Sequence, residues 1–100
     1  MQIQINAADI ESSQAIQQYV HDNVEKHLGH HEQHITRVEV HLRDDNAGKS
    51  GSNDKRCVVE VRIANAQPLA VESTGEDMYG TINDAIAKAG RATKNKIDRG

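Results

Sequence analysis

The 100-residue sequence contains no Phe and no Trp, and two tyrosines are its only residues of the Phe, Trp and Tyr class. A hydrophobic core built from this chain must therefore consist of Ile, Val, Leu, Met and Ala. Because the chain is also short, we expect a small core and modest stability. The lack of aromatic side chains further excludes a set of rings on which single-stranded bases stack.

Cysteine is almost absent. Cys57 is the single cysteine, so the chain cannot form an intrachain disulfide, and this usage favours a reducing compartment. The first residues have neither a basic start nor a long apolar segment, so no secretory signal is visible. No apolar run approaches the length needed to span a membrane. We therefore expect a cytoplasmic protein with no membrane partner.

Catalytic motifs are missing as well. Cys57 falls on the apolar side of an alternating segment, as a buried and unreactive thiol does. The serines lie at helix starts or in a loop, without the glycine context of a nucleophile elbow. The Gly-Lys-Ser-Gly run at residues 48–51 lacks the first glycine of a phosphate-binding loop. We expect no enzyme activity, no small-molecule substrate and no cofactor.

Hydrophobic periodicity divides the chain into strands and helices. Alternation of apolar and polar residues predicts strands near residues 2–6, 35–43, 57–63 and 68–75. Four-residue spacing predicts one helix that starts at Asp9, Ser12 or Ser13 and stops at Gly29, and a second helix over residues 76–99. Residues 30–34 are predicted to form a polar connection, and residues 44–54 an exposed, mobile loop.

The order β-α-β-β-β-α predicts an α+β fold. Short connections favour antiparallel pairing of the later strands. A four-stranded, mostly antiparallel sheet with both helices packed on one face buries the apolar residues most economically. No repeat or change in composition divides the chain, so residues 1–100 are predicted to form a single domain.

Charge is unevenly distributed, although the formal net charge is only −3. Acidic side chains dominate residues 1–34, where Lys26 is the only Lys or Arg. The end of the chain is cationic, and its Lys and Arg residues are Lys88, Arg91, Lys94, Lys96 and Arg99. A cationic helix face of this kind suits phosphate. The preference of helix C-termini for positive charge explains it equally well.

Five of the histidines form a cluster near the end of the first predicted helix. They are His21, His27, His30, His31 and His34. Imidazoles at near-helical spacing suit Zn²⁺, Ni²⁺ or Cu²⁺, but a helix stop at Gly29 would disrupt their shared face. We predict that these histidines are solvated and form no metal site. Metal binding by His27, His30, His31 and His34 stays open as an alternative. His41, on the outward face of a strand, is predicted to be equally ordinary.

The closing segment resembles the last helix of the ribosome hibernation-promoting factor and ribosome-associated inhibitor family. The likeness rests on the opening Asp77-Met78-Tyr79, on Ile82 three residues later, and on Lys and Arg at the matching spacing. Residues 1–5 and 13–20 also align with the first strand and helix of that family without a gap. Nearly the whole chain therefore resembles the short form of the family, as a diverged and unusually acidic member.

The resemblance implies a ribosome-associated domain with the same β-α-β-β-β-α order, similar to the double-stranded-RNA-binding type. It implies a stress and hibernation factor that binds the small ribosomal subunit and its 16S rRNA in the mRNA and tRNA channel and inhibits translation. The residues that match its rRNA-binding pattern are Lys26, Lys88, Arg91, Lys94 and Lys96. By charge and predicted position, Arg99, Arg37 and Arg62 could extend that surface.

An alternative function follows from the positions at which this chain differs from the family pattern. The first helix carries Asp22 and Glu25 where family members have lysines, which predicts fewer phosphate contacts and weaker binding. A diverged paralogue could keep the fold and act instead as a protein-interaction module in stress, through a weak homodimer and without binding the ribosome.

Overall fold

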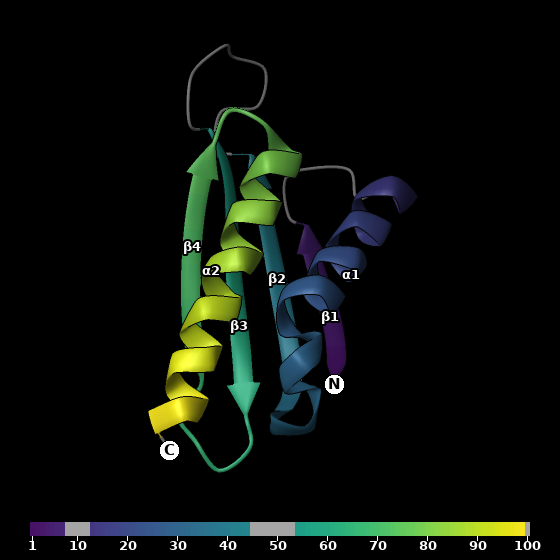
Figure 1. Cartoon of the computed structure of the whole chain (residues 1–100). Helices are drawn as coiled ribbons and strands as arrows, with labels where there is room; N and C mark the ends of the chain where they lie inside the picture. The colour runs from purple at the N-terminus through teal and green to yellow at the C-terminus, as the bar shows by residue number, and fades with distance from the viewer. Residues whose placement is uncertain (8–12, 45–53, 100) are drawn as a thin grey trace.

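The computed structural model describes residues 1–7, 13–44 and 54–99 of the chain (Figure 1). The elements follow in the order β1 (Gln2–Ala7), α1 (Gln14–Leu28), the 3₁₀ helix η1 (Gly29–His34), β2 (Ile35–Asp44), β3 (Lys55–Ile63), β4 (Leu69–Gly75) and α2 (Met78–Arg99). The predicted α+β fold with the order β-α-β-β-β-α is confirmed.

The four strands form one mixed sheet in the order β1-β2-β3-β4. β1 pairs with β2 in parallel, because α1 carries the chain back along the sheet before β2 begins. The pairs β2–β3 and β3–β4 are antiparallel, as predicted. Between β3 and β4 the Ala66 amide donates to the Ile63 carbonyl at 3.3 Å, and Asn65 has a φ of 61°. Asn tolerates this left-handed conformation better than most residues.

Side-chain caps fix where both long helices begin. The Ser13 hydroxyl accepts a hydrogen bond from the Ile16 amide at 3.1 Å, and the Asp77 carboxylate accepts one from the Gly80 amide at 2.8 Å. Each cap satisfies an amide that the first helical turn leaves without a partner. Of the predicted starts of the first helix, Ser13 is therefore the cap, and the other two lie outside the described residues.

The connection between α1 and β2 differs from the prediction. Gly29 has a right-handed φ of −58° and its amide donates to the Glu25 carbonyl, so the chain does not stop turning there. It continues as η1 through His34. The histidines of this segment consequently lie on a helical turn that packs against the end of α1 and the second half of α2.

The two ends of the predicted 44–54 loop also differ from expectation. Asp44 is the last residue of β2, and Asp54 is buried. The Lys55 ammonium lies 2.8 Å from the Asp54 carboxylate and 3.1 Å from the Asp44 carboxylate. The hydrogen bond from Lys55 lowers the pKa of Asp54. The rest of the predicted loop, residues 45–53, lies outside the described residues.

Both helices cover one face of the sheet, with α2 over β3 and β4 and beside α1 (Figure 1). The alternating apolar residues of β2 and β3 point into this layer and are fully buried. They are Val38, Val40, Leu42, Cys57, Val59 and Val61. Against them pack Val20, Val24 and Leu28 of α1 and Ile82, Ile86 and Ala89 of α2. The core is therefore aliphatic, as the composition predicts.

The helices run side by side in the same direction (Figure 1). Near their starts the rings of Tyr19 and Tyr79 meet edge to face, with centroids 5.0 Å apart. Farther along, Gly90 of α2 lies against the backbone of α1. A Cβ atom on Gly90 would lie 2.8 Å from the carbonyl oxygen of His27 and 3.2 Å from its Cβ. The absence of a side chain at residue 90 allows this close approach.

Replacement of Gly90 by alanine should destabilise the protein by about 1–3 kcal/mol, because a methyl group would push the helices apart. The loss should occur although alanine favours an isolated helix by about 1 kcal/mol over glycine. Urea unfolding followed by circular dichroism measures the change.

Gly80→Ala, in the same helix, is the matched control. Its added Cβ would meet only the Asp77 carboxylate, at 3.3 Å, and residue 80 is exposed. This variant should range from neutral to about 1 kcal/mol more stable. Equal destabilisation of both variants would contradict the role given to Gly90.

The single thiol makes stability depend on alkaline pH. Burial raises the pKa of Cys57 from its ordinary value of 9.0 to about 12. Below pH 9 the thiol is protonated in both the folded and the unfolded state. Between about pH 9 and 12 only the unfolded state releases the proton, so the free energy of unfolding should fall by up to roughly 1.4 kcal/mol per pH unit. In Cys57→Ala this part of the fall should disappear when both proteins are unfolded in urea across that range.

Candidate nucleic-acid interface

The parallel arrangement of α1 and α2 places their C-terminal ends at the same end of the molecule (Figure 1). Lys26 and His27 lie in the last turn of α1, and Lys96 and Arg99 in the last turn of α2. Cations in a last turn complement the partial negative charge of the helix C-terminus. Because both helices follow this preference and point the same way, their basic residues gather together.

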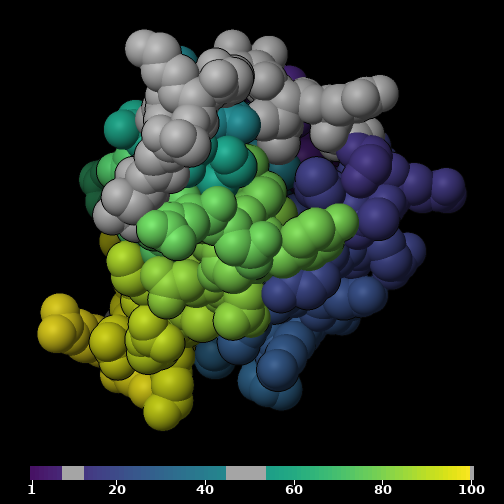
Figure 2. All heavy atoms as spheres, turned by 90° about the horizontal axis from the view of Figure 1, so that it is seen from above, coloured from purple at the N-terminus to yellow at the C-terminus, as the bar shows by residue number. Residues whose placement is uncertain are grey.

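A hollow of about 260 Å³, which we call the helix groove, lies between the two helices and η1. In Figure 2 the green and yellow atoms of α2 adjoin the blue atoms of α1 on one exposed face. The groove is lined by Lys26, His27, His30, His31, Ala87, Gly90, Arg91 and Lys94. Among these lining residues there are three permanent cations, three imidazoles and no carboxylate.

Within the part of the chain that the structure describes, the permanent cations of the groove have no competing partners. Lys26, Arg91 and Lys94 are exposed, and none of them makes an ion pair or hydrogen bond within the described ranges. Their charges are therefore available to a ligand. The sequence-predicted Lys26 thus joins two of the predicted residues of α2, although the two helices are far apart in the chain.

The remaining predicted cations of α2 lie on its other side, toward β4. Lys88 donates a hydrogen bond to the Glu72 carbonyl at 3.1 Å and lies 3.8 Å from the Asp84 carboxylate, with 44% of its side chain exposed. Lys96 and Arg99 line a hollow of about 520 Å³ together with Leu69. Lys88 is therefore tethered and yet solvent-accessible, and the two terminal cations extend the basic end of the helix.

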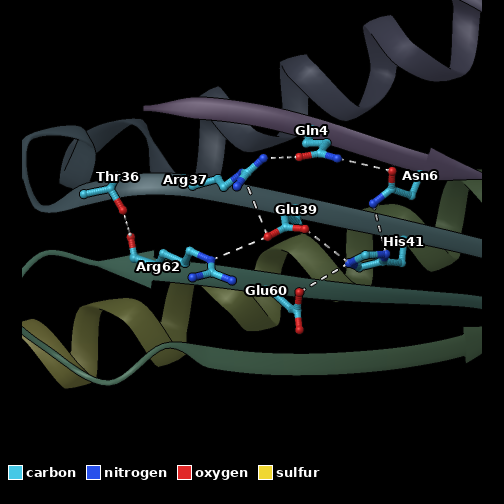
Figure 3. A network of polar contacts seen from close by, with 8 residues as sticks. All are labelled: Gln4, Asn6, Thr36, Arg37, Glu39, His41, Glu60 and Arg62. Carbon is cyan, nitrogen blue, oxygen red and sulfur yellow. Dashed lines mark hydrogen bonds and ion pairs between the residues drawn. The ribbon is translucent and has the colours of Figure 1, made fainter.

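Arg37 and Arg62 lie on the opposite, open face of the sheet (Figure 3). Successive side chains of a strand alternate between faces, and the apolar set takes the side toward the helices. Both arginines approach the same carboxylate oxygen of Glu39, with their Nε atoms at 3.9 and 3.5 Å. The structure therefore divides the sequence-predicted cations between two faces, and it pairs those of the open face with an acid.

The acidic residues are segregated from the helix groove. On α1, Asp22 accepts a hydrogen bond from Gln18 at 2.9 Å, and neither Asp22 nor Glu25 lines the groove. Glu76 and Asp77, which precede α2, and Asp84 in its first half line a separate hollow near the start of that helix. Negative charge at a helix N-terminus is favourable for the same reason as positive charge at the C-terminus.

Sequence reasoning missed the part played by the histidines. His27, His30 and His31 line the groove beside Arg91 and Lys94. His27 Nε2 is buried without a hydrogen-bond partner among the described residues.

The metal-binding alternative gains no support, because the described part of the chain brings no three members of the histidine cluster within reach of one ion. In the sequence, the adjacent Lys26-His27 pair at a helix end was the only feature that pointed to histidines beside the cations of the groove.

Comparison with known proteins identifies the family. Residues 3–99 match the family described as sigma 54 modulation protein / S30EA ribosomal protein. The chain belongs to this family. Membership makes it a ribosome-associated hibernation and modulation factor, and it confirms the resemblance carried by the closing helix. A family of ribosome-associated factors also agrees with the expectation of no enzyme activity.

Two solved structures of other proteins have the same fold as this S30EA family member. A ribosomal subunit interface protein from Coxiella burnetii superimposes with a TM-score of 0.78 at 15% identity, covering 97% of this chain and 99% of that one. The N-terminal domain of Thermus thermophilus Protein Y gives a TM-score of 0.77 at 23% identity, covering 95% and 98%. At these identities the likeness supports the fold alone. No curated protein sequence matches the chain significantly.

None of the described helices is both long enough and apolar enough to cross a membrane. α2 has sufficient length, with 22 residues, but its exposed side carries the basic residues discussed above.

Proposed function

We propose that this S30EA family member binds 16S rRNA of the small ribosomal subunit in the mRNA and tRNA channel, and thereby inhibits translation in the cytoplasm under stress. The observation that supports this proposal is the helix groove. Its three permanent cations are exposed, have no partner within the described residues, and share the groove with no carboxylate.

An exposed groove of this kind suits a phosphate backbone better than a small molecule. Phosphate contacts need several cations on an accessible face and no enclosed pocket. α2 is about 33 Å long, so its basic half can follow a backbone past the groove. Lys88 on one side and Lys96 and Arg99 at the end extend the same basic half of the helix.

The arginines of the open face contribute less in this proposal. Arg37 and Arg62 approach Glu39, and Arg37 also donates to the Gln4 side chain. A phosphate contact would have to replace these interactions, whereas Arg91 and Lys94 have none to replace within the described ranges. The helix-covered face is therefore the primary RNA-binding surface, and the open face is secondary.

The triple variant Lys88→Glu, Arg91→Glu and Lys94→Glu should lose cosedimentation with purified small subunits at low salt. For the unchanged protein, the logarithm of the binding constant should fall linearly with the logarithm of salt concentration. Each phosphate contact contributes roughly 0.7–0.9 to that slope, so a variant with three contacts removed should show a slope smaller by about 2–3. Sedimentation across a salt series measures both quantities.

The double variant Arg37→Gln and Arg62→Gln is the matched control, and it should retain most of the binding. Circular dichroism confirms that both proteins fold. Unchanged cosedimentation of the triple variant would count against the proposal. Absence of binding by the unchanged protein, together with self-association that increases with concentration, would favour the protein-interaction alternative.

A single substitution on α1 tests whether the groove, rather than α2 alone, contacts RNA. Lys26→Ala should reduce the salt slope by roughly 0.7–0.9, the same amount as Lys94→Ala. Gln18→Ala, on the same helix and outside the groove, should leave the slope unchanged. An effect of Lys94→Ala without any effect of Lys26→Ala would restrict the interface to α2.

A further inference from the structure

The open face of the sheet carries a second cluster of charged side chains, separate from the helix groove (Figure 3). Glu39 of β2 stands directly opposite Glu60 of β3 in the strand register. Two carboxylates facing each other across a strand pair repel and destabilise the pairing. Arg37 and Arg62 offset the charge of Glu39, and a cation placed between the two carboxylates would reduce the remaining repulsion.

His41 completes the cluster. Its Nε2 atom lies 3.3 Å from a Glu60 carboxylate oxygen and 3.9 Å from a carboxylate oxygen of Glu39. One donor atom from each of these three side chains lies within 4.8 Å of the others. In a tetrahedral site with metal–ligand bonds of about 2.0–2.1 Å, ligand atoms lie roughly 3.3 Å apart. Small side-chain rotations therefore bring all three donors to one ion.

Neighbouring residues contact the side chains of Glu39 and His41. Arg37 and Arg62 both approach Oε2 of Glu39, which leaves Oε1 directed at His41. On the other side of the imidazole, the Asn6 side-chain amide lies 3.3 Å from Nδ1. The amide nitrogen of Asn6 faces the ring, and its oxygen accepts a hydrogen bond from Gln4. Metal binding therefore requires the Asn6 amide to turn over, so that its oxygen accepts the Nδ1 proton and leaves the Nε2 lone pair free for a metal.

We propose that Glu39, His41 and Glu60 form a binding site for one divalent transition-metal ion, with Zn²⁺ the best match. One imidazole and two carboxylates are ligands that Zn²⁺ accepts, and water would complete the coordination. The three side chains are 15–44% exposed, so an ion can reach them from solvent. The site is separate from the helix groove, the primary surface proposed for rRNA, because it lies on the opposite face of the sheet.

Isothermal titration of the full chain with Zn²⁺ alone tests the site. We expect one saturable ion per chain, and we expect it to be lost in His41→Ala and weakened in the conservative Glu60→Gln. His30→Ala combined with His31→Ala is the control for the other histidines and should bind Zn²⁺ unchanged. Asn6→Ala, which removes only the positioning amide, should weaken binding by about 10- to 100-fold.

NMR amide spectra locate the bound ion and show whether each variant folds. With Zn²⁺, shifts should concentrate in the middle of β2 and β3 and spare η1. The proposal is overturned by an absence of saturable binding, by equal binding in folded His41→Ala, or by loss of binding in the His30 and His31 double variant. Failure of rRNA binding would leave this result unaffected, so the two proposals fail separately.

Discussion

The close contact between Gly90 and the backbone of His27 determines how the two helices lie on the sheet. Because residue 90 has no side chain, α2 reaches the backbone of α1, and the helices remain parallel along one face. The same approach brings the last turn of α1 beside the middle of α2. Lys26 and His27 thereby meet Arg91 and Lys94, and the core beneath the helices closes with small and aliphatic side chains.

The two faces of the sheet divide the charged residues into distinct surfaces. On the covered side, the helices carry charged residues on their outer surfaces, and helix polarity favours basic residues toward the end of α2. On the open side, strand pairing brings arginines and glutamates from separate strands together, and they interact with one another. Arg37 and Arg62 on the open side therefore each have a carboxylate partner, whereas the cations of the helix groove have none among the described residues.

Net charge is a poor guide to this molecule. The chain is acidic overall, yet the helix groove is locally basic. Electrostatic interactions at physiological ionic strength fade over about 8 Å, so a phosphate in the groove responds to the nearest side chains more than to distant carboxylates. The acidic residues of α1 do not line the groove, and Glu76, Asp77 and Asp84 line a separate hollow near the start of α2. This segregation makes an acidic member of the family compatible with RNA binding.

The sequence alone determined the order of elements, the sheet face buried by each strand and the family, because alternation, four-residue spacing and the Asp77-Met78-Tyr79 opening are local patterns. It could not show that the chain continues through Gly29 into η1, because this depends on the backbone conformation of Gly29 and not on composition. Nor could it show that Lys26 and the histidines join Arg91, or that Glu60 reaches His41. Those neighbours are far apart in the chain. Only the packing of α1 against α2 and the register of β2 with β3 bring them together.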